Sequence, residues 1–324
     1  MTARVWSCIF LSSIFIAVLS SCWVNAGALS SEAADTRSVE FAMKNVTYHY
    51  SEPVAVHIMQ LQGELVPTKA GTIVFFDDKN SFDLRLKYAE IAISCNALAQ
   101  VLNENVFSSS DSPFKNLSIE SKNNQLIMKG NLPQKANVAF ETTGRLSADP
   151  DGRIRVHSDQ VKTAHLPVKG LMDLLGIDIA SLIDTKKIHG IAAEKDDLIL
   201  DSEQILPAPH IKGKVAAVRV RGNEIVFTFG VPQPSNFAAK QSGNYMAFRH
   251  SDMRFGKLTM HDADLIMIDM DPSDPFDFFL DHYQDQLVAG YTKSTPQYGL
   301  RTYTRDYNKL KNRRIPKPSN SPPW

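Results

Sequence analysis

Acidic side chains form the one cluster in this sequence whose types and spacing could do chemistry. They lie in three short segments, at 261–264, 269–277 and 281–282. Asp269, Asp271 and Asp274 could converge on a hard cation such as Ca²⁺, which takes about six to eight oxygen ligands. The loop lacks the mid-loop glycine and the closing glutamate of an EF-hand, and Asp271 and Asp274 equally suit a turn and a helix N-cap. We therefore predict no metal site, and a metal-dependent envelope hydrolase is the least favoured function.

No other pattern in the sequence indicates catalysis. The sequence contains no nucleophile elbow, phosphate loop, dinucleotide fingerprint or His-Glu-x-x-His motif. Its nine histidines show no ligand spacing on one helix face. The 35 basic and 35 acidic residues balance, which argues against nucleic acid as the main ligand. The sequence thus predicts a protein that is not an enzyme, with no catalytic residue and no cofactor.

Cys22 is the residue for which the sequence predicts a covalent modification. Arg4 precedes a short apolar run, Ile9 to Leu19, and the run ends in Leu-Ser-Ser-Cys, which resembles a bacterial lipobox. Residues 1–22 are therefore predicted to be a signal and lipobox segment, and Cys22 the lipidated first residue of the mature chain. This places the protein outside the cytoplasm, on the periplasmic side of the cell envelope, as a membrane-anchored lipoprotein.

Two alternatives to lipidation remain open. Cleavage after Val24-Asn25-Ala26 would release a secreted protein. Retention as an uncleaved anchor is less favoured, because the apolar run is well short of the ~20 residues that span a bilayer. Beyond the export segment the sequence has a single cysteine, Cys95, whose apolar neighbours predict a buried structural thiol.

A chain of β-strands follows the export segment. Residues 23–37 are small and polar, which predicts a flexible spacer, and a lipid-binding-like domain is predicted at 38–231. We expect strands at 39–50, 54–66, 71–76 and 82–93, and an amphipathic helix at 94–106 with Ser94 as its N-cap. Tight turns predict three hairpins, at 117–132, 138–161 and 214–229.

The remaining segments are expected to be mixed. A helix is predicted at 165–176, with Pro167 in its first turn and further apolar turns to residue 183. A C-terminal α+β segment is predicted at 237–308, with strands at 245–249, 252–260 and 263–270. Its helix would begin at Asp274 and bury one apolar face, made of Phe276, Phe279, Leu280, Tyr283 and Leu287. A disordered basic tail is predicted at 309–324.

The order of these elements resembles a known family over about residues 88–230. The elements concerned are the helix at 95–106, the strand pairs at 117–132 and 138–161, Leu166-Pro167-Val168 leading into an apolar helix through Leu182, and the hairpin at 215–229. Together they resemble the LmeA-like phospholipid-binding family of exported bacterial proteins, whose fold is related to the TULIP lipid-binding modules. The resemblance implies an α+β, β-rich fold in which a long, curved antiparallel sheet wraps around amphipathic helices, with a C-terminal strand-helix extension.

The same resemblance implies an apolar groove for acyl chains. The residues expected to line it are Leu98, Val101, Leu102, Leu171, Leu174, Leu175, Ile225, Phe227 and Phe229. The favoured function is a non-catalytic cell-envelope lipoprotein that binds or carries a phospholipid or other acyl lipid. The alternative is a structural or interaction lipoprotein with a solidly packed core, and an apolar cavity in the structure would favour the first over the second.

The lipobox prediction is tested by the substitution Cys22→Ala. It removes the thiol that would be acylated, so the protein should move from the detergent phase to the aqueous phase on phase separation. Cys8→Ala, a change in the same export segment, should leave partitioning as in the wild type. Unchanged partitioning of the Cys22→Ala protein would contradict lipidation at this residue.

Overall fold

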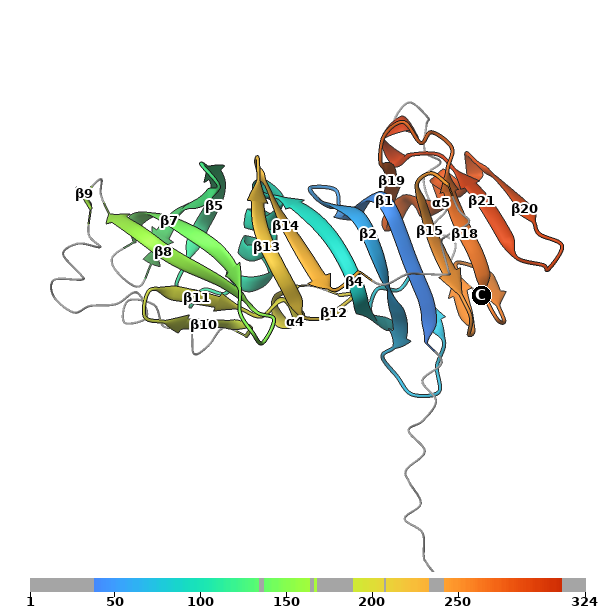
Figure 1. The fold of residues 1–324 in the computed structure, drawn as a ribbon, viewed down its shortest axis with the longest axis horizontal. Helices are drawn as coiled ribbons and strands as arrows, with labels where there is room; N and C mark the ends of the chain where they lie inside the picture. The colour runs from blue at the N-terminus through green and yellow to red at the C-terminus, as the bar shows by residue number, and fades with distance from the viewer. Residues whose placement is uncertain are drawn as a thin grey trace, which may run out of the picture. The chain divides into compact units, whose positions relative to one another are not determined.

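The computed structural model describes residues 38–133, 137–163, 166–167, 189–206, 208–232 and 242–310 (Figure 1). The predicted export segment, Cys22 and the spacer lie outside the described residues, as do most of the helix predicted at 165–183 and the chain after residue 310. Leu171, Leu174 and Leu175 also fall outside them.

Antiparallel pairing dominates the largest sheet of the described residues, which follows the order β13-β14-β4-β2-β1-β15-β18-β21-β20. Only β12 with β4, β19 with β1 and β21 with β18 pair in parallel. The strands are β1 (Val39–Ser51), β2 (Val54–Pro67), β4 (Phe82–Ser94), β12 (Ile211–Lys212), β13 (Val215–Arg221), β14 (Glu224–Gly230), β15 (Tyr245–Arg249), β18 (Asp264–Asp269), β19 (Phe276–Phe279), β20 (Tyr291–Ser294) and β21 (Leu300–Thr304).

The second sheet follows the order β10-β11-β8-β7-β6-β5, with β9 on β8. Its strands are β5 (Lys115–Lys122), β6 (Gln125–Leu132), β7 (Val138–Ala148), β8 (Ile154–Thr163), β9 (Leu166–Pro167), β10 (Ile191–Glu194) and β11 (Asp197–Leu200). A third sheet contains β3 (Val74–Phe75), β16 (Met253–Phe255) and β17 (Leu258–Met260). The fold is therefore β-rich with few helices, as predicted, and the hairpins β5–β6, β7–β8 and β13–β14 are confirmed.

The helices of the described residues are short. They are α1 (Cys95–Val101), the π-helix η1 (Leu102–Val106), α4 (Ser202–Ile205), the 3-10 helix η3 (Leu280–His282), α5 (Tyr283–Val288) and the 3-10 helix η4 (Tyr307–Leu310). The predicted N-cap of α1 is confirmed, because the Ser94 hydroxyl accepts a hydrogen bond from the Ala97 amide at 3.1 Å.

The C-terminal segment continues the large sheet. β15 pairs with β1, from Glu40 opposite Arg249 to Lys44 opposite Tyr245. Phe248 of β15 packs its ring 4.9 Å from that of Phe41 and 4.8 Å from that of Phe76. All the described residues belong to one compact unit, so the segments predicted at 38–231 and 237–308 share a sheet and a core.

The helix predicted to begin at Asp274 is wrong over its first turn. Phe276–Phe279 form strand β19, which pairs in parallel with β1, and the chain becomes helical only from Leu280. Phe276 and Phe278 alternate into the core, and β1 offers a free edge for the strand, so sheet pairing prevails over the helical pattern. The burial of Phe276, Phe279, Leu280 and Tyr283 is confirmed.

Three other predictions need correction. Leu166 and Pro167 form the short strand β9 on β8 rather than a helical turn, since the fixed φ of proline also suits an edge strand. The strand at 252–260 is a hairpin, β16–β17, turning at Gly256, which has φ +60°. Lys309 and Leu310 belong to η4 instead of a disordered tail, because Leu310 is buried and Lys309 is held by ion pairs.

Gln286 completes the hydrogen bonding of β19 on the side away from β1. Its side-chain oxygen accepts from the Phe279 amide at 3.0 Å, and its amide group donates to the carbonyls of Asp277 at 2.8 Å and Arg305 at 2.9 Å. The residue has no exposed surface. The Asp277 amide on the same edge donates to the Asp306 carboxylate at 2.9 Å. The Gln286 and Asp306 side chains thus replace a neighbouring strand, and Gln286 ties α5 to β19.

Gln286→Leu should therefore destabilise the fold by about 3–5 kcal/mol, since each buried backbone group left without a partner costs about 1–3 kcal/mol. Urea denaturation measures the change. Gln284→Leu, an exposed position in the same helix, should change the free energy of unfolding by less than about 0.5 kcal/mol. Equal effects of the two substitutions would contradict this role for Gln286.

Candidate functional site

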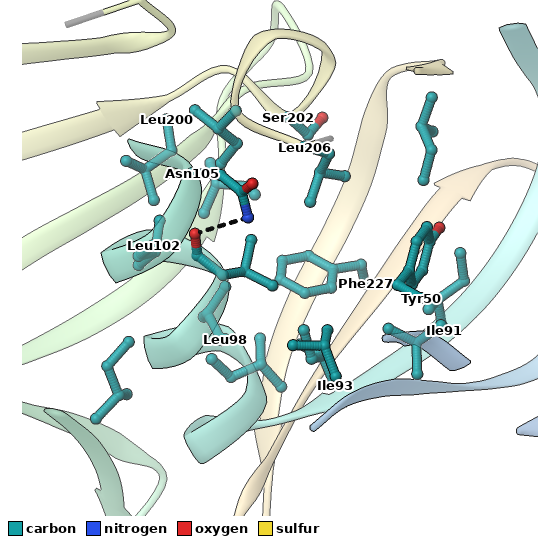
Figure 2. A pocket seen from close by; sticks show the side chains of 18 of the residues that line it. Tyr50, Ile91, Ile93, Leu98, Leu102, Asn105, Leu200, Ser202, Leu206 and Phe227 are labelled. Carbon is teal, nitrogen blue, oxygen red and sulfur yellow. Dashed lines mark hydrogen bonds between the residues drawn. The ribbon is translucent and has the colours of Figure 1, made fainter. Parts of the chain in front are cut away.

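An apolar cavity of about 250 Å³ lies where the large and second sheets approach each other. On the side of the large sheet it is lined by β2, β4 and β14, and on the side of the second sheet by β5, β6, β7, β8 and β11. Helix α1, the π-helix η1 and the segment around α4 close it between the sheets. Figure 2 shows Phe227 projecting into the cavity, between Leu102 and Tyr50.

Six of the residues that the sequence predicts for an apolar groove line this cavity. They are Leu98, Val101, Leu102, Ile225, Phe227 and Phe229. Strand period explains the last three, because alternate residues of β14 point to the same face of the sheet. Helical period explains the first three, which lie three and four residues apart along α1 and the start of η1.

Charged side chains on the outer face of the second sheet leave its inner face to the cavity. On β8, Arg155 and His157 alternate with the buried Ile154 and Val156. The His157 Nδ1 lies 2.6 Å from a carboxylate oxygen of Asp197 on β11. The same alternation places Ile119, Leu126, Met128, Leu146 and Leu200 in the cavity wall. Sequence reasoning located these hairpins but did not assign their inner residues to a site.

Several apolar side chains of the cavity are only half-buried, although they lie between two core clusters. Val56, Leu146, Leu200 and Phe227 pack against both clusters and keep part of their surface open to the cavity. Fully packed cores leave no such surface, because side chains interdigitate at crystal-like density. The open surface is therefore available to an apolar ligand.

The hydroxyl groups of Tyr50, Ser51 and Ser202 bring polarity to this apolar wall, while the Asn105 amide at its edge donates to the Val101 carbonyl. Tyr50, at the end of β1, and Ser202, in α4, both line the cavity (Figure 2). Burial raises the pKa of Tyr50 to about 12, so its hydroxyl stays a neutral donor. Exposed Lys79 and Glu104 add one charge of each sign at the cavity edge.

A second apolar cavity, of about 80 Å³, adjoins the first. Aromatic side chains of Phe107, Phe114 and Phe140 line it, together with aliphatic residues of the second sheet. Leu102 lines both cavities.

The acidic cluster is built around an ammonium group. Lys309 Nζ lies 2.7 Å from Asp271 Oδ2, 3.1 Å from Asp274 Oδ1 and 2.8 Å from Asp306 Oδ2. These three carboxylates form the group within the described residues whose oxygens lie close enough to share a cation. Lys309 already supplies a positive charge there. The cluster thus attaches η4 to the loop between β18 and β19.

The other acidic residues of the sequence cluster have separate partners. The Asp269 carboxylate accepts hydrogen bonds from the Asn244 side chain at 2.8 Å and the Asp271 amide at 2.8 Å, while burial raises its pKa. Asp264 pairs with Arg301 at 3.1 Å. Asp274, predicted to cap a helix, binds Lys309 instead. The structure therefore does not assemble Asp269, Asp271 and Asp274 as three ligands of one site.

Cys95 is a buried free thiol at the start of α1. Burial raises its pKa, so the unreactive thiol form is favoured at neutral pH. The predicted structural role agrees with this environment.

Comparison of the chain with protein-family models, with curated proteins and with solved structures finds no match. Among the described residues, no helix has the length and apolar character needed to cross a membrane.

The cluster around Lys309 makes a prediction about pH. Hydrogen bonds from Lys309, and then from Ser273, lower the pKa of Asp271 to about 2. Lys309→Met should raise this pKa toward the ordinary value of about 3.9, as measured by a carboxyl-carbon NMR titration. A depressed carboxyl pKa stabilises the fold above the unfolded-state pKa, so the stability lost in Lys309→Met should shrink as the pH falls from about 4 to about 2.

Lys293→Met is the matched control for this prediction. Lys293 lies on β20, where its ammonium group contacts the rings of Tyr291 and Tyr303. The substitution should leave the Asp271 pKa near 2. An unchanged Asp271 pKa in Lys309→Met would contradict the role of the ammonium group.

Proposed function

We propose that this protein binds or carries a lipid, holding its acyl chain in the 250 Å³ cavity, and performs no covalent chemistry. The observation that carries the proposal is the apolar wall with open surface on Leu98, Phe227 and Leu200. The finer arrangement of the fold, a curved sheet wrapped around amphipathic helices, belongs to the same proposal. So does the likeness to the LmeA-like phospholipid-binding proteins.

The energetics of the cavity support this function. An apolar cavity of about 150 Å³ lined by Leu, Ile and Phe stays dry and binds benzene. The cavity here is larger and has a similar lining. Each methylene group that leaves water for such a wall contributes about 0.8 kcal/mol to binding. A chain of several methylene groups therefore supplies enough free energy to hold a lipid without a charged contact inside the cavity.

The polar groups of the cavity support a lipid whose polar end accepts hydrogen bonds. The Tyr50 and Ser202 hydroxyls would donate to an ester or carboxyl oxygen, which lacks a partner once it leaves water. Lys79 and Glu104 at the edge would contact the headgroup in solvent.

Cys22 supplies the proposed attachment. A lipidated N-terminus and the spacer at 23–37 would hold the domain beside a membrane on the periplasmic side of the cell envelope. Phospholipid or another acyl lipid is then the proposed partner, taken from or delivered to that membrane.

The open cavity favours this proposal over a structural or interaction lipoprotein with a solidly packed core, since such a core leaves few voids larger than a water molecule. Lys309 among the carboxylates likewise lends no support to a metal-dependent hydrolase.

Phe227→Gln tests the proposed function. The substitution places a polar group where the chain would lie, so affinity for a fluorescent phospholipid should fall about tenfold or more while most of the thermal stability remains. Thr228→Gln changes the next residue of β14, which points to the other face, and should leave binding near the wild-type level. A wild-type protein that binds no phospholipid, or equal losses in both variants, would contradict the proposal.

A further inference from the structure

The two cavities meet at four residues. Met128, Val156 and Leu200 lie on β6, β8 and β11 of the second sheet, and Leu102 is the first residue of the π-helix η1. Three of the shared residues are thus part of one sheet face, and the fourth comes from the helical segment that covers it. Leu102 is 5% exposed, so its side chain fills the space at this boundary.

The small cavity suits hydrocarbon. Apart from Thr142 and Ser158, its lining is apolar, and three of its side chains are phenyl rings. Charged groups are absent from its described lining. A dry space of this kind gains dispersion contacts when an apolar group enters it.

Of the two hydroxyl groups proposed to bind the ligand's oxygens, that of Tyr50 lies across the large cavity from Leu102, whereas Ser202 lies near Leu200. Figure 2 places Tyr50 and Leu102 on opposite sides of Phe227. A chain whose oxygens meet the Tyr50 hydroxyl therefore points its methyl end toward Leu102 and the small cavity.

We propose that the small cavity is a subsite for the far end of a long acyl chain, and that Leu102 closes it and sets the chain length that the protein prefers. The inference rests on the proposed function. In the wild type, affinity rises with each methylene group until the chain reaches Leu102, and longer chains gain little more. Reducing Leu102 to a methyl group joins the two cavities and moves this limit to longer chains.

The experiment measures the affinity of saturated fatty acids of increasing length, by displacement of a fluorescent fatty acid. In the wild type, each added methylene group should tighten binding about fourfold up to a plateau. In Leu102→Ala the plateau should begin at a longer chain, with the same fourfold gain for each additional methylene group.

Leu102→Met conserves the side-chain volume and should fold even where Leu102→Ala does not. Its unbranched chain yields to the ligand more easily, which should move the plateau in the same direction by a smaller amount.

Leu126→Ala is the matched control. Leu126 is as buried as Leu102 but lines the large cavity alone. Truncation of the Leu126 side chain should change the affinity for every fatty acid of the series without opening the small cavity. The plateau should therefore shift less than it does in Leu102→Ala. A plateau at the wild-type length in both Leu102 variants would overturn the subsite while leaving lipid binding intact. A wild type that binds no fatty acid of any length would instead overturn the proposed function.

Discussion

The pairing of β1 on both edges is the constraint on which the rest of the structure depends. β2 covers one edge along its whole length, while the other edge is divided between β15, at residues 40–44, and β19, at residues 46–49. Asn45 stands at the division with φ 52°, a conformation that asparagine tolerates better than most residues. Its side-chain amide donates to Asn244 at 2.9 Å, and its oxygen accepts from His57 at 2.8 Å. One strand thereby joins the cavity-bearing part of the large sheet to its C-terminal part.

The cavity follows from how two core clusters meet. Around Phe41, Phe76 and Phe248 the aromatic rings lie 4.8–6.2 Å apart, and the packing is continuous. The second cluster lies between the inner face of the second sheet, helix α1 and Ile93 and Ile225 of the large sheet. Where the two approach, strands of different sheets face each other without a shared hydrogen-bond ladder to set their spacing. Space remains there, and the side chains of the cavity wall lack dispersion contacts that the side chains of the dense core make.

Alternation and tight turns were enough to predict most strands from the sequence, because each such signal is local. The residues of α1 and β14 that line the cavity were predictable for the same reason. Tyr50 and Ser202 were not, since only the approach of distant segments brings them to one wall. The helix predicted over Phe276 to Leu287 was wrong at its start for a different reason. The apolar residues of this segment fit a helical period, but Phe276 and Phe278 also fit the period of a strand. The free edge of β1 favours the strand, because it offers backbone groups for pairing.

The divided edge of β1 also determines the order in which the chain can fold. Asn45 and Asn244, which contact each other at the division, are 199 residues apart in sequence. During synthesis β1 emerges well before β15 and β19, the strands that cover its second edge. Until then the edge offers unpaired amide and carbonyl groups to any other extended chain. Pairing over such a separation is slow, so this edge stays open to other chains for longer than the edges of strands that pair in local hairpins.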